Sequence, residues 1–223
     1  MNVLVIAPHR DDEILGVGGT ILKRKAAGHR VAVCIVAASE GCKMQPEYRK
    51  ITDIVHQEML KSHEFCGIDR YIGLPFLSVL LETYSRMELN QAVLNTILEE
   101  RPEEVYIPFW GDMQRDHQIV TEAAMVALRA KYNHPVKRIY AYETLSETGI
   151  NLPTVNNAFI PNVFEDITDF LEGKKQALSY YQSQIQAFPD LRSLEAVDAL
   201  AKFRGATVNV KAAEAFMLIR EIK

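Results

Sequence analysis

The chain has 223 residues, with 25 basic and 29 acidic side chains and a formal net charge of −4. Hydrophobic residues make up 48% and charged residues 24% of it, which is typical of a folded globular protein and excludes disordered and collagen-like classes. No apolar run approaches the roughly 20 residues of a membrane span, and the start lacks the basic segment of a signal peptide. No block of lysine and arginine stands out, so we expect neither nucleic acid nor a membrane as a partner.

The chain contains three cysteines, Cys34, Cys42 and Cys66. Their number is odd and none forms a Cys-x-x-Cys pair, so a zinc site built from cysteines is not expected. Unpaired cysteines suit a reducing compartment, and we therefore predict a cytoplasmic protein.

Short apolar runs alternate with amphipathic stretches along the chain. In order, we expect a strand at 3–7, a helix at 14–27, a strand at 30–38 and helices at 48–66 and 89–100. A strand at 104–109, a helix at 115–131 and a strand at 137–143 follow. The last part predicts helices at 166–183 and 193–203 around a break at Pro189, and an ending at 213–220 that fits either a strand or a helix.

Apolar strands joined by helices are typical of a parallel sheet that is covered on both faces. We therefore predict an α/β fold with a Rossmann-like, mostly parallel sheet. Residues 1–223 are expected to form one domain, with the part beyond about residue 160 as an extension of it.

A cluster of polar side chains directly follows the first predicted strand. Residues 8–13 read Pro-His-Arg-Asp-Asp-Glu, and ligands of parallel sheets bind beyond the carboxyl ends of the strands. Carboxylates at a helix start also cap free backbone N–H groups, which would explain Asp11 or Asp12 alone. Capping does not explain His9 beside two adjacent aspartates, so this loop indicates metal or acid–base chemistry.

The glycines that follow, Gly16, Gly18 and Gly19, do not match a dinucleotide-binding fingerprint. That motif needs its glycines in the turn itself, whereas here they fall inside the predicted helix. Close packing of this helix on the sheet explains the glycines better. The three carboxylates in the turn would also repel the pyrophosphate of a dinucleotide.

A second polar loop, residues 108–117, follows the strand at 104–109 and opens the next helix. Asp116 and His117 are the pair expected to face the same edge of the sheet. Alone, His117 would be read as an ordinary surface histidine. Together the two loops offer a His/Asp/His set, which is typical of a zinc site that keeps one position open for water. Iron, cobalt or manganese also suit these ligands.

The first loop resembles the His-Pro-Asp-Asp-Glu signature of the LmbE-like, or PIG-L, zinc-dependent N-deacetylases. Residues 16–20 extend the match, and Gln-Arg-Asp-His at 114–117 is similar to the second signature of the family, His-x-Asp-His. The similarity continues in order through residues 141–144, 161–164, 166–167, 192–195, 204–205 and 213–216, and so covers essentially the whole chain.

The resemblance implies that His9, Asp12 and His117 bind the metal and that Asp11 is the general base. It also implies that Asp116 supports the neighbouring catalytic group. The expected activity is the Zn²⁺-dependent removal of an acetyl or related acyl group from an amino sugar or its conjugate, a small molecule. The resemblance further implies a homo-oligomer.

Three positions depart from the family pattern. Gln114 replaces the first histidine of the second signature, and its amide can donate a hydrogen bond to an oxyanion but cannot deliver a proton. Asp190 replaces a histidine, and Arg10 replaces a proline within the first signature. Two alternatives therefore remain: hydrolysis of a non-sugar amide in a specialised metabolite pathway, and a metal-binding relative with weakened catalysis.

Four further side chains are candidates for contact with the substrate. Arg115 and Arg192 suit an anionic group, Trp110 suits the face of a sugar ring, and Tyr142 ends a strand near the expected site. Each also has a simpler explanation in solvation, ion pairing or ordinary packing. The other histidines are expected on loops or helix surfaces without a role; they are His29, His56, His63 and His134.

Overall fold

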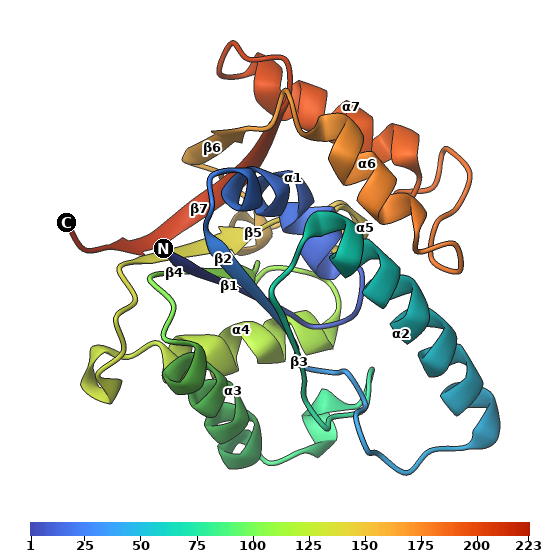
Figure 1. Cartoon of the computed structure of the whole chain (residues 1–223), viewed down its shortest axis with the longest axis vertical. Helices are drawn as coiled ribbons and strands as arrows, with labels where there is room; N and C mark the ends of the chain where they lie inside the picture. Colours follow the sequence, from blue (N-terminus) through green and yellow to red (C-terminus); the bar gives the residue numbers. More distant parts are fainter.

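The computed structural model describes all residues from 1 to 223 as one seven-stranded sheet with helices on both faces (Figure 1). The strands are β1 (Asn2–Ala7), β2 (Arg30–Ile35), β3 (Arg70–Gly73), β4 (Glu104–Pro108), β5 (Arg138–Tyr142), β6 (Val163–Asp166) and β7 (Ala213–Glu221). The α-helices are α1 (Asp12–Ala26), α2 (Pro46–Cys66), α3 (Arg86–Glu100), α4 (Arg115–Ala127), α5 (Leu145–Thr148), α6 (Leu171–Ser179) and α7 (Leu194–Ala206). Short 3-10 helices lie at Leu81–Thr83, Ala130–Tyr132 and Val155–Asn157.

The strand order is β3-β2-β1-β4-β5-β7-β6, and the first five strands in this order are parallel. The chain builds outward from β1 to β3 and then crosses back to place β4 on the other side of β1. The loops after β1 and β4 therefore leave the sheet side by side, and the chain continues from them in opposite directions along the strand order. Such folds bind ligands at this point. The predicted Rossmann-like, mostly parallel sheet is confirmed.

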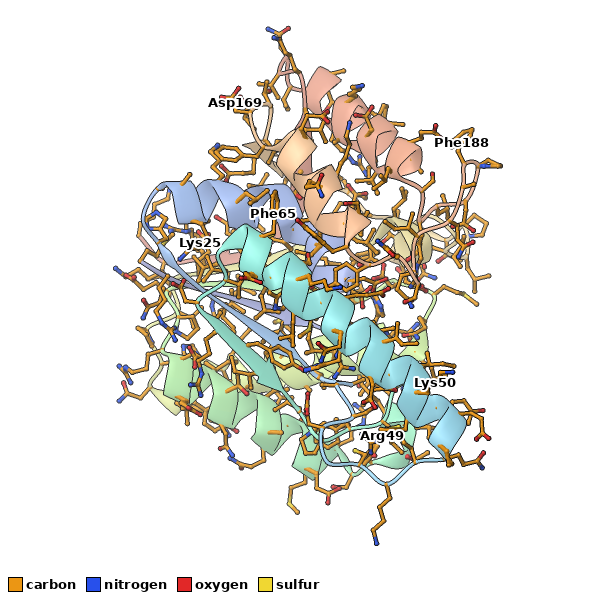
Figure 2. All side chains as sticks on the ribbon, turned by 45° about the vertical axis from the view of Figure 1, so that its right-hand side comes forward. Lys25, Arg49, Lys50, Phe65, Asp169 and Phe188 are labelled. Carbon is orange, nitrogen blue, oxygen red and sulfur yellow. The ribbon has the colours of Figure 1, made fainter.

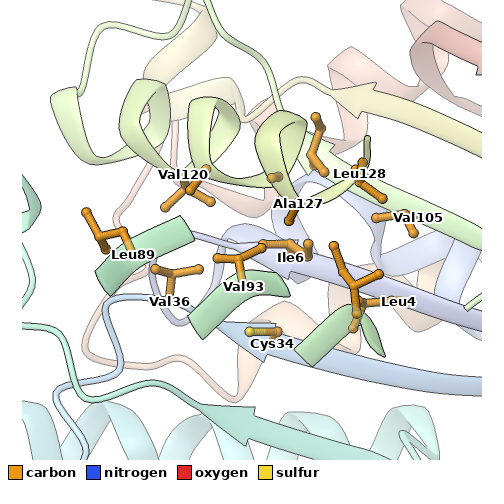
Figure 3. Packing of buried hydrophobic residues seen from close by; sticks show 14 of the residues in the cluster. Leu4, Ile6, Cys34, Val36, Leu89, Val93, Val105, Val120, Ala127 and Leu128 are labelled. Carbon is orange, nitrogen blue, oxygen red and sulfur yellow. The ribbon is translucent and has the colours of Figure 1, made fainter. Parts of the chain in front are cut away.

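Alternate residues of the central strands supply two hydrophobic layers. Leu4 and Ile6 face α3 and α4, where they join Val93 and Val120 in one buried cluster (Figure 3). Val3, Val5 and Ala7 belong to the opposite cluster, which is covered by α1, α2, α6 and α7. This alternation fixes the register of β1, because a shift by one residue would exchange the two faces.

The glycines of α1 allow this helix to pack closely, as the sequence predicts. A side chain on Gly16 would overlap the ring of Tyr142, and one on Gly19 would lie 2.8 Å from Ile167. The backbone of α1 thus rests directly on β5 and on the residue that follows β6.

The structure differs from the sequence prediction mainly in the last third of the chain. The helix predicted at 166–183 is wrong at its start: residues 163–166 form β6, and α6 begins only at Leu171. Asp166 explains the difference, because its carboxylate accepts hydrogen bonds from the backbone and the hydroxyl of Thr168 and so makes a turn instead of a helix. The ending at 213–220 is a strand, β7, which pairs antiparallel with both β5 and β6.

No helix combines the length and the apolar character that crossing a membrane would require.

Candidate metal centre and active site

The loops after β1 and β4 bring three metal-ligating side chains together. One ligand atom each from His9, Asp12 and His117 lies within 4.8 Å of the others. Asp12 Oδ2 is 3.4 Å from His9 Nδ1 and 3.2 Å from His117 Nε2. Asp12 and His117 are buried, and the side chain of His9 is 16% exposed, so the cluster opens to solvent on the side of His9.

Each histidine uses its other ring nitrogen to contact a carboxylate. His9 Nε2 lies 2.9 Å from Asp116 Oδ2, and His117 Nδ1 lies 2.8 Å from Asp112 Oδ2. These contacts fix both rings so that His9 Nδ1 and His117 Nε2 face Asp12. A carboxylate behind a metal-binding histidine orients the ring and increases the basicity of the ligand nitrogen.

The residues present fit a divalent transition metal. His117 Nε2 and Asp12 Oδ1 are buried and have no hydrogen-bond partner, although such atoms are nearly always paired in folded proteins. Two imidazoles and one carboxylate are ligands that suit zinc and related ions, and three protein ligands leave a position for water. A metal bound there would satisfy both orphaned atoms.

The electrostatic field around the cluster favours a cation. Burial acts to lower the pKa of His9, but hydrogen bonds to Asp116 and Asp12 raise this pKa to about 9. Burial likewise opposes the charge on His117, yet Asp12 and Asp112 raise the pKa of His117 to about 10. Asp12, although buried, has its pKa held well below the usual range by the two histidines. The carboxylates therefore stabilise positive charge at the place where the ligand atoms converge.

Asp11 lies beside the cluster but makes a different set of contacts. Its side chain is 2% exposed, Oδ2 has no hydrogen-bond partner, and the nearest cation is Arg192, whose Nη1 is 3.6 Å away. Burial and the neighbouring Asp12 raise the pKa of Asp11 to about 8 against the opposing charge of Arg192. Asp11 is thus a buried carboxylate with a strong affinity for a proton.

Arg192 is presented by a turn that contains one of the departures from the family pattern. Asp190 Oδ1 accepts a hydrogen bond of 2.8 Å from the backbone N–H of Arg192. The Arg192 guanidinium lies between Asp11 and Glu147, at 3.6 and 3.9 Å. Asp190 therefore has a local structural role, which is to hold the turn that brings Arg192 to Asp11.

Arg10, another departure, has a structural role as well. It is buried, and its Nη2 donates to the carbonyl of Ala38 at 2.7 Å. This bond ties the first loop to the segment that follows β2.

Asp116 is a positioning group in this structure. Besides His9, its carboxylate accepts backbone N–H bonds from Val79 at 2.7 Å and from Leu81 at 3.3 Å. These bonds occupy both oxygens, so the carboxylate orients His9 and fixes the segment after β3.

The side chains of four further predicted residues form no hydrogen bond or ion pair with His9, Asp12 or His117. Gln114 precedes α4, and its Oε1 is buried without a hydrogen-bond partner. Trp110 is 42% exposed and packs on Phe109, with ring centroids 4.7 Å apart. Arg115 is exposed on α4 and donates to Gln118. The expected role of Tyr142 is wrong: the ring is fully buried and its hydroxyl donates to the carbonyl of Ile6, so it does not reach a substrate.

Four residues that the sequence did not mark as parts of the site lie in or behind it: Asp112, His63, Glu13 and Thr148. Asp112 lies in the second polar loop, and Thr148 Oγ1 donates to its Oδ1 at 2.5 Å. His63 is buried, not on a helix surface, and its Nε2 contacts Glu13 Oε1 at 3.0 Å. Asp112 could have been predicted as a site residue, because it is one of the acidic residues of the second polar loop. His63 could not, because no motif surrounds it in the sequence.

Replacing Asp112 with Asn is expected to weaken metal binding by about 10- to 100-fold. The amide has a single, uncharged acceptor oxygen, for which the His117 ring and the Thr148 hydroxyl then compete, so the ring is held less firmly and its ligand nitrogen becomes less basic. Metal titration monitored by calorimetry checks this. Equal affinities of Asp112→Asn and the wild-type protein would show that His117 needs no such partner.

Known proteins share sequence and fold with this chain. The PIG-L family model, described as GlcNAc-PI de-N-acetylase, matches residues 4–128, which is more than half of the chain and includes both polar loops. A diacetylchitobiose deacetylase of Thermococcus kodakarensis is 27% identical over 198 residues, covering 85% of this chain and 71% of that protein.

Two solved structures share the fold over nearly the whole chain. The conserved protein TT1542 from Thermus thermophilus superposes with a TM-score of 0.75 at 25% identity, covering 99% of this chain and 96% of that one. The N,N'-diacetylchitobiose deacetylase from Pyrococcus horikoshii, solved with an inhibitor, gives a TM-score of 0.77 at 24% identity, covering 98% and 84%. The chain therefore belongs to the PIG-L, or LmbE-like, family of de-N-acetylases.

Proposed function

We propose that the protein is a metal-dependent hydrolase that removes an acetyl or related acyl group from the nitrogen of an amino sugar or its conjugate. The observation that carries this proposal is the convergence of His9, Asp12 and His117 beside the buried carboxylate of Asp11. The amino sugar as substrate is supported by the similarity to a diacetylchitobiose deacetylase. Zinc is the proposed metal, and another divalent transition metal is the alternative.

A divalent ion held by His9, Asp12 and His117 would make a bound water more acidic and polarise the amide carbonyl. Asp11 then removes a proton from the attacking water, for which its unpaired Oδ2 is available. The C–N bond of the tetrahedral intermediate breaks, and Asp11 returns the proton to the leaving amine. The products are acetate and a free amine, so one carboxyl group serves as base and then as acid.

Gln114 and Arg192 are the groups proposed to assist this reaction. The Gln114 amide, at the start of α4, donates a hydrogen bond to the oxyanion and so stabilises it. It does not transfer a proton, which is left to Asp11. Arg192 stabilises Asp11 while that carboxylate is charged, because the guanidinium lies 3.6 Å away. Arg115 and Trp110 are kept as proposed substrate contacts at the rim, for an anionic group and a sugar ring.

The experiment is acetate release from a panel of N-acetylated amino sugars and their conjugates by the zinc-loaded protein and Gln114→His. Turnover by the wild-type protein identifies the substrate and supports the proposal. Turnover by Gln114→His alone would favour the alternative of a weakened family member. Release by neither protein from any sugar, with zinc bound to both, would contradict the sugar assignment and favour a non-sugar amide.

We further propose that residues 1–223 form one domain and that the protein acts in the cytoplasm as a homo-oligomer. The pairing of β7 with β5 supports the first point, because it joins the end of the chain to the parallel sheet. The unpaired cysteines support the second, and the family resemblance supports the third.

A further inference from the structure

Glu13 is fully buried at the start of α1, and hydrogen bonds occupy both of its carboxylate oxygens. Oε1 accepts from the hydroxyl of Tyr181 at 2.5 Å and contacts His63 Nε2 at 3.0 Å. Oε2 accepts from the backbone N–H of Asp11 at 3.1 Å. The mechanism proposed above makes no use of this carboxylate.

The residue that Glu13 holds has an unusual backbone conformation. Asp11 has φ 106° and ψ −29°, a backbone conformation that residues other than glycine rarely adopt. Such a conformation persists only where the surroundings determine it, and it is frequent at functional sites. Here the carbonyl of Asp11 accepts from Ile14 and Leu15 in the first turn of α1, while its N–H is held by Glu13.

This conformation separates the tasks of two adjacent aspartates. Asp12 points to His9 and His117, whereas Asp11 points to Arg192. A regular helical or extended backbone at Asp11 would direct its carboxylate elsewhere, so the position of the proposed base depends on the strained residue.

The partners of Glu13 come from distant parts of the chain. His63 lies in the last turn of α2, and Tyr181 follows α6. The two elements meet where the ring of Phe65 packs on Tyr180, with centroids 5.7 Å apart, and Figure 2 shows Phe65 at the end of α2 next to α6. Glu13 is therefore held from two sides by elements that also cover the sheet.

We propose that Glu13 is a positioning residue that holds Asp11 in its catalytic orientation, and that His63 and Tyr181 hold Glu13. The inference rests on the proposed function, in which Asp11 transfers the proton. If so, a substitution at Glu13, His63 or Tyr181 lowers the rate of hydrolysis because it weakens the hydrogen bond to the Asp11 N–H.

The test compares Glu13→Gln with the wild-type protein, both loaded with zinc. The glutamine has nearly the same shape but only one acceptor oxygen, so it cannot accept hydrogen bonds from the Asp11 N–H and from the Tyr181 hydroxyl on opposite sides at the same time. We expect kcat to fall on the order of 10- to 100-fold, because a small misplacement of a catalytic group is costly. KM and the zinc content are expected to stay at their wild-type values.

Hydrogen exchange gives a readout that does not depend on activity. The Asp11 amide is expected to exchange faster in Glu13→Gln than in the wild-type protein, because a neutral amide oxygen accepts a weaker hydrogen bond than the carboxylate does and Tyr181 competes for it. A matched control is Glu104→Gln. Glu104 is equally buried and accepts from the Tyr106 hydroxyl at 2.9 Å, but it lies at the amino end of β4, whereas the site lies beyond the carboxyl end. This control is expected to lose stability but to keep kcat and Asp11 exchange.

Tyr181→Phe is the second variant, because it removes a single hydroxyl. It is expected to shift kcat and Asp11 exchange in the same direction as Glu13→Gln, but less. Wild-type kcat and Asp11 exchange in folded Glu13→Gln, or in Tyr181→Phe if Glu13→Gln does not fold, would overturn the inference. If the zinc-loaded wild-type protein hydrolyses no amide, the proposed function fails instead, and the exchange data alone decide whether Glu13 holds Asp11.

Discussion

Replacing Asp11 with Asn is expected to lower kcat by a factor on the order of 10² to 10⁴. The amide has nearly the size of the carboxylate but cannot take the proton of the attacking water or return one to the leaving amine. Because Asp11 is not among the three ligand residues, the metal content of Asp11→Asn should equal that of the wild-type protein. The measurement is steady-state acetate release together with metal analysis of the same preparations.

Asp198→Asn is a suitable control for this prediction. Asp198 lies on α7 and pairs with Lys175 and Lys202 outside the candidate site, so its replacement is expected to leave kcat unchanged. If Asp11→Asn retained the wild-type kcat with metal bound, Asp11 would not be the base. If it lost its metal, Asp11 would have to be counted among the ligands.

Replacing Glu214 with Ala is expected to reduce the free energy of unfolding by about 3–5 kcal/mol, because a buried charge is left without its partner. Glu214 and Lys174 are both almost fully buried, and Lys174 Nζ lies 2.6 Å from Glu214 Oε1. Lys174 also donates to the carbonyl of Leu15, while Glu214 accepts from the N–H of Gly19. A regular helix pairs these two backbone groups with each other, so the ion pair adds hydrogen bonds to the backbone in the middle of α1.

Denaturant unfolding of Glu214→Ala beside the double variant Lys174→Met/Glu214→Leu tests this argument. The double variant should lose less stability than Glu214→Ala, since it leaves no unpaired charge. Glu221→Gln, on the exposed end of the same strand, is the control and should unfold like the wild-type protein. A loss below about 1 kcal/mol for Glu214→Ala would place the pair among weak surface bridges.

The parts of the site that lie at strand ends could be predicted from the sequence. β1 and β4 are continuous apolar runs, so the polar residues that follow them had to leave the sheet at the same edge. His9, Asp12 and His117 were found in this way together with the family resemblance, and the structure brings their ligand atoms together.

What the sequence could not provide is contact between distant segments. Glu13 meets His63 and Tyr181 across separations of 50 and 168 residues, and no local pattern marks these partners. Tyr142 was misjudged for a related reason. It ends β5 next to the site in the sheet, but the absence of a side chain at Gly16 lets its ring pack beneath α1.

The strand β6 was missed because turn chemistry outweighed the helical pattern. Residues 166–183 contain enough apolar residues at helical spacing to predict a single long helix. The Asp166 carboxylate instead accepts hydrogen bonds from Thr168, and the four residues that end at Asp166 form β6 beside β7.

Acetate release before and after removal of the metal tests most directly whether the protein is a metal-dependent deacetylase. The protein is stripped with a chelator, assayed on the N-acetylated amino sugar found in the panel, and titrated with Zn²⁺. We expect no turnover by the stripped protein, full recovery at one ion per chain, and no recovery in His117→Ala, because the structure offers a single set of ligand atoms. Wild-type turnover by the stripped protein, or full recovery in His117→Ala, would contradict this expectation.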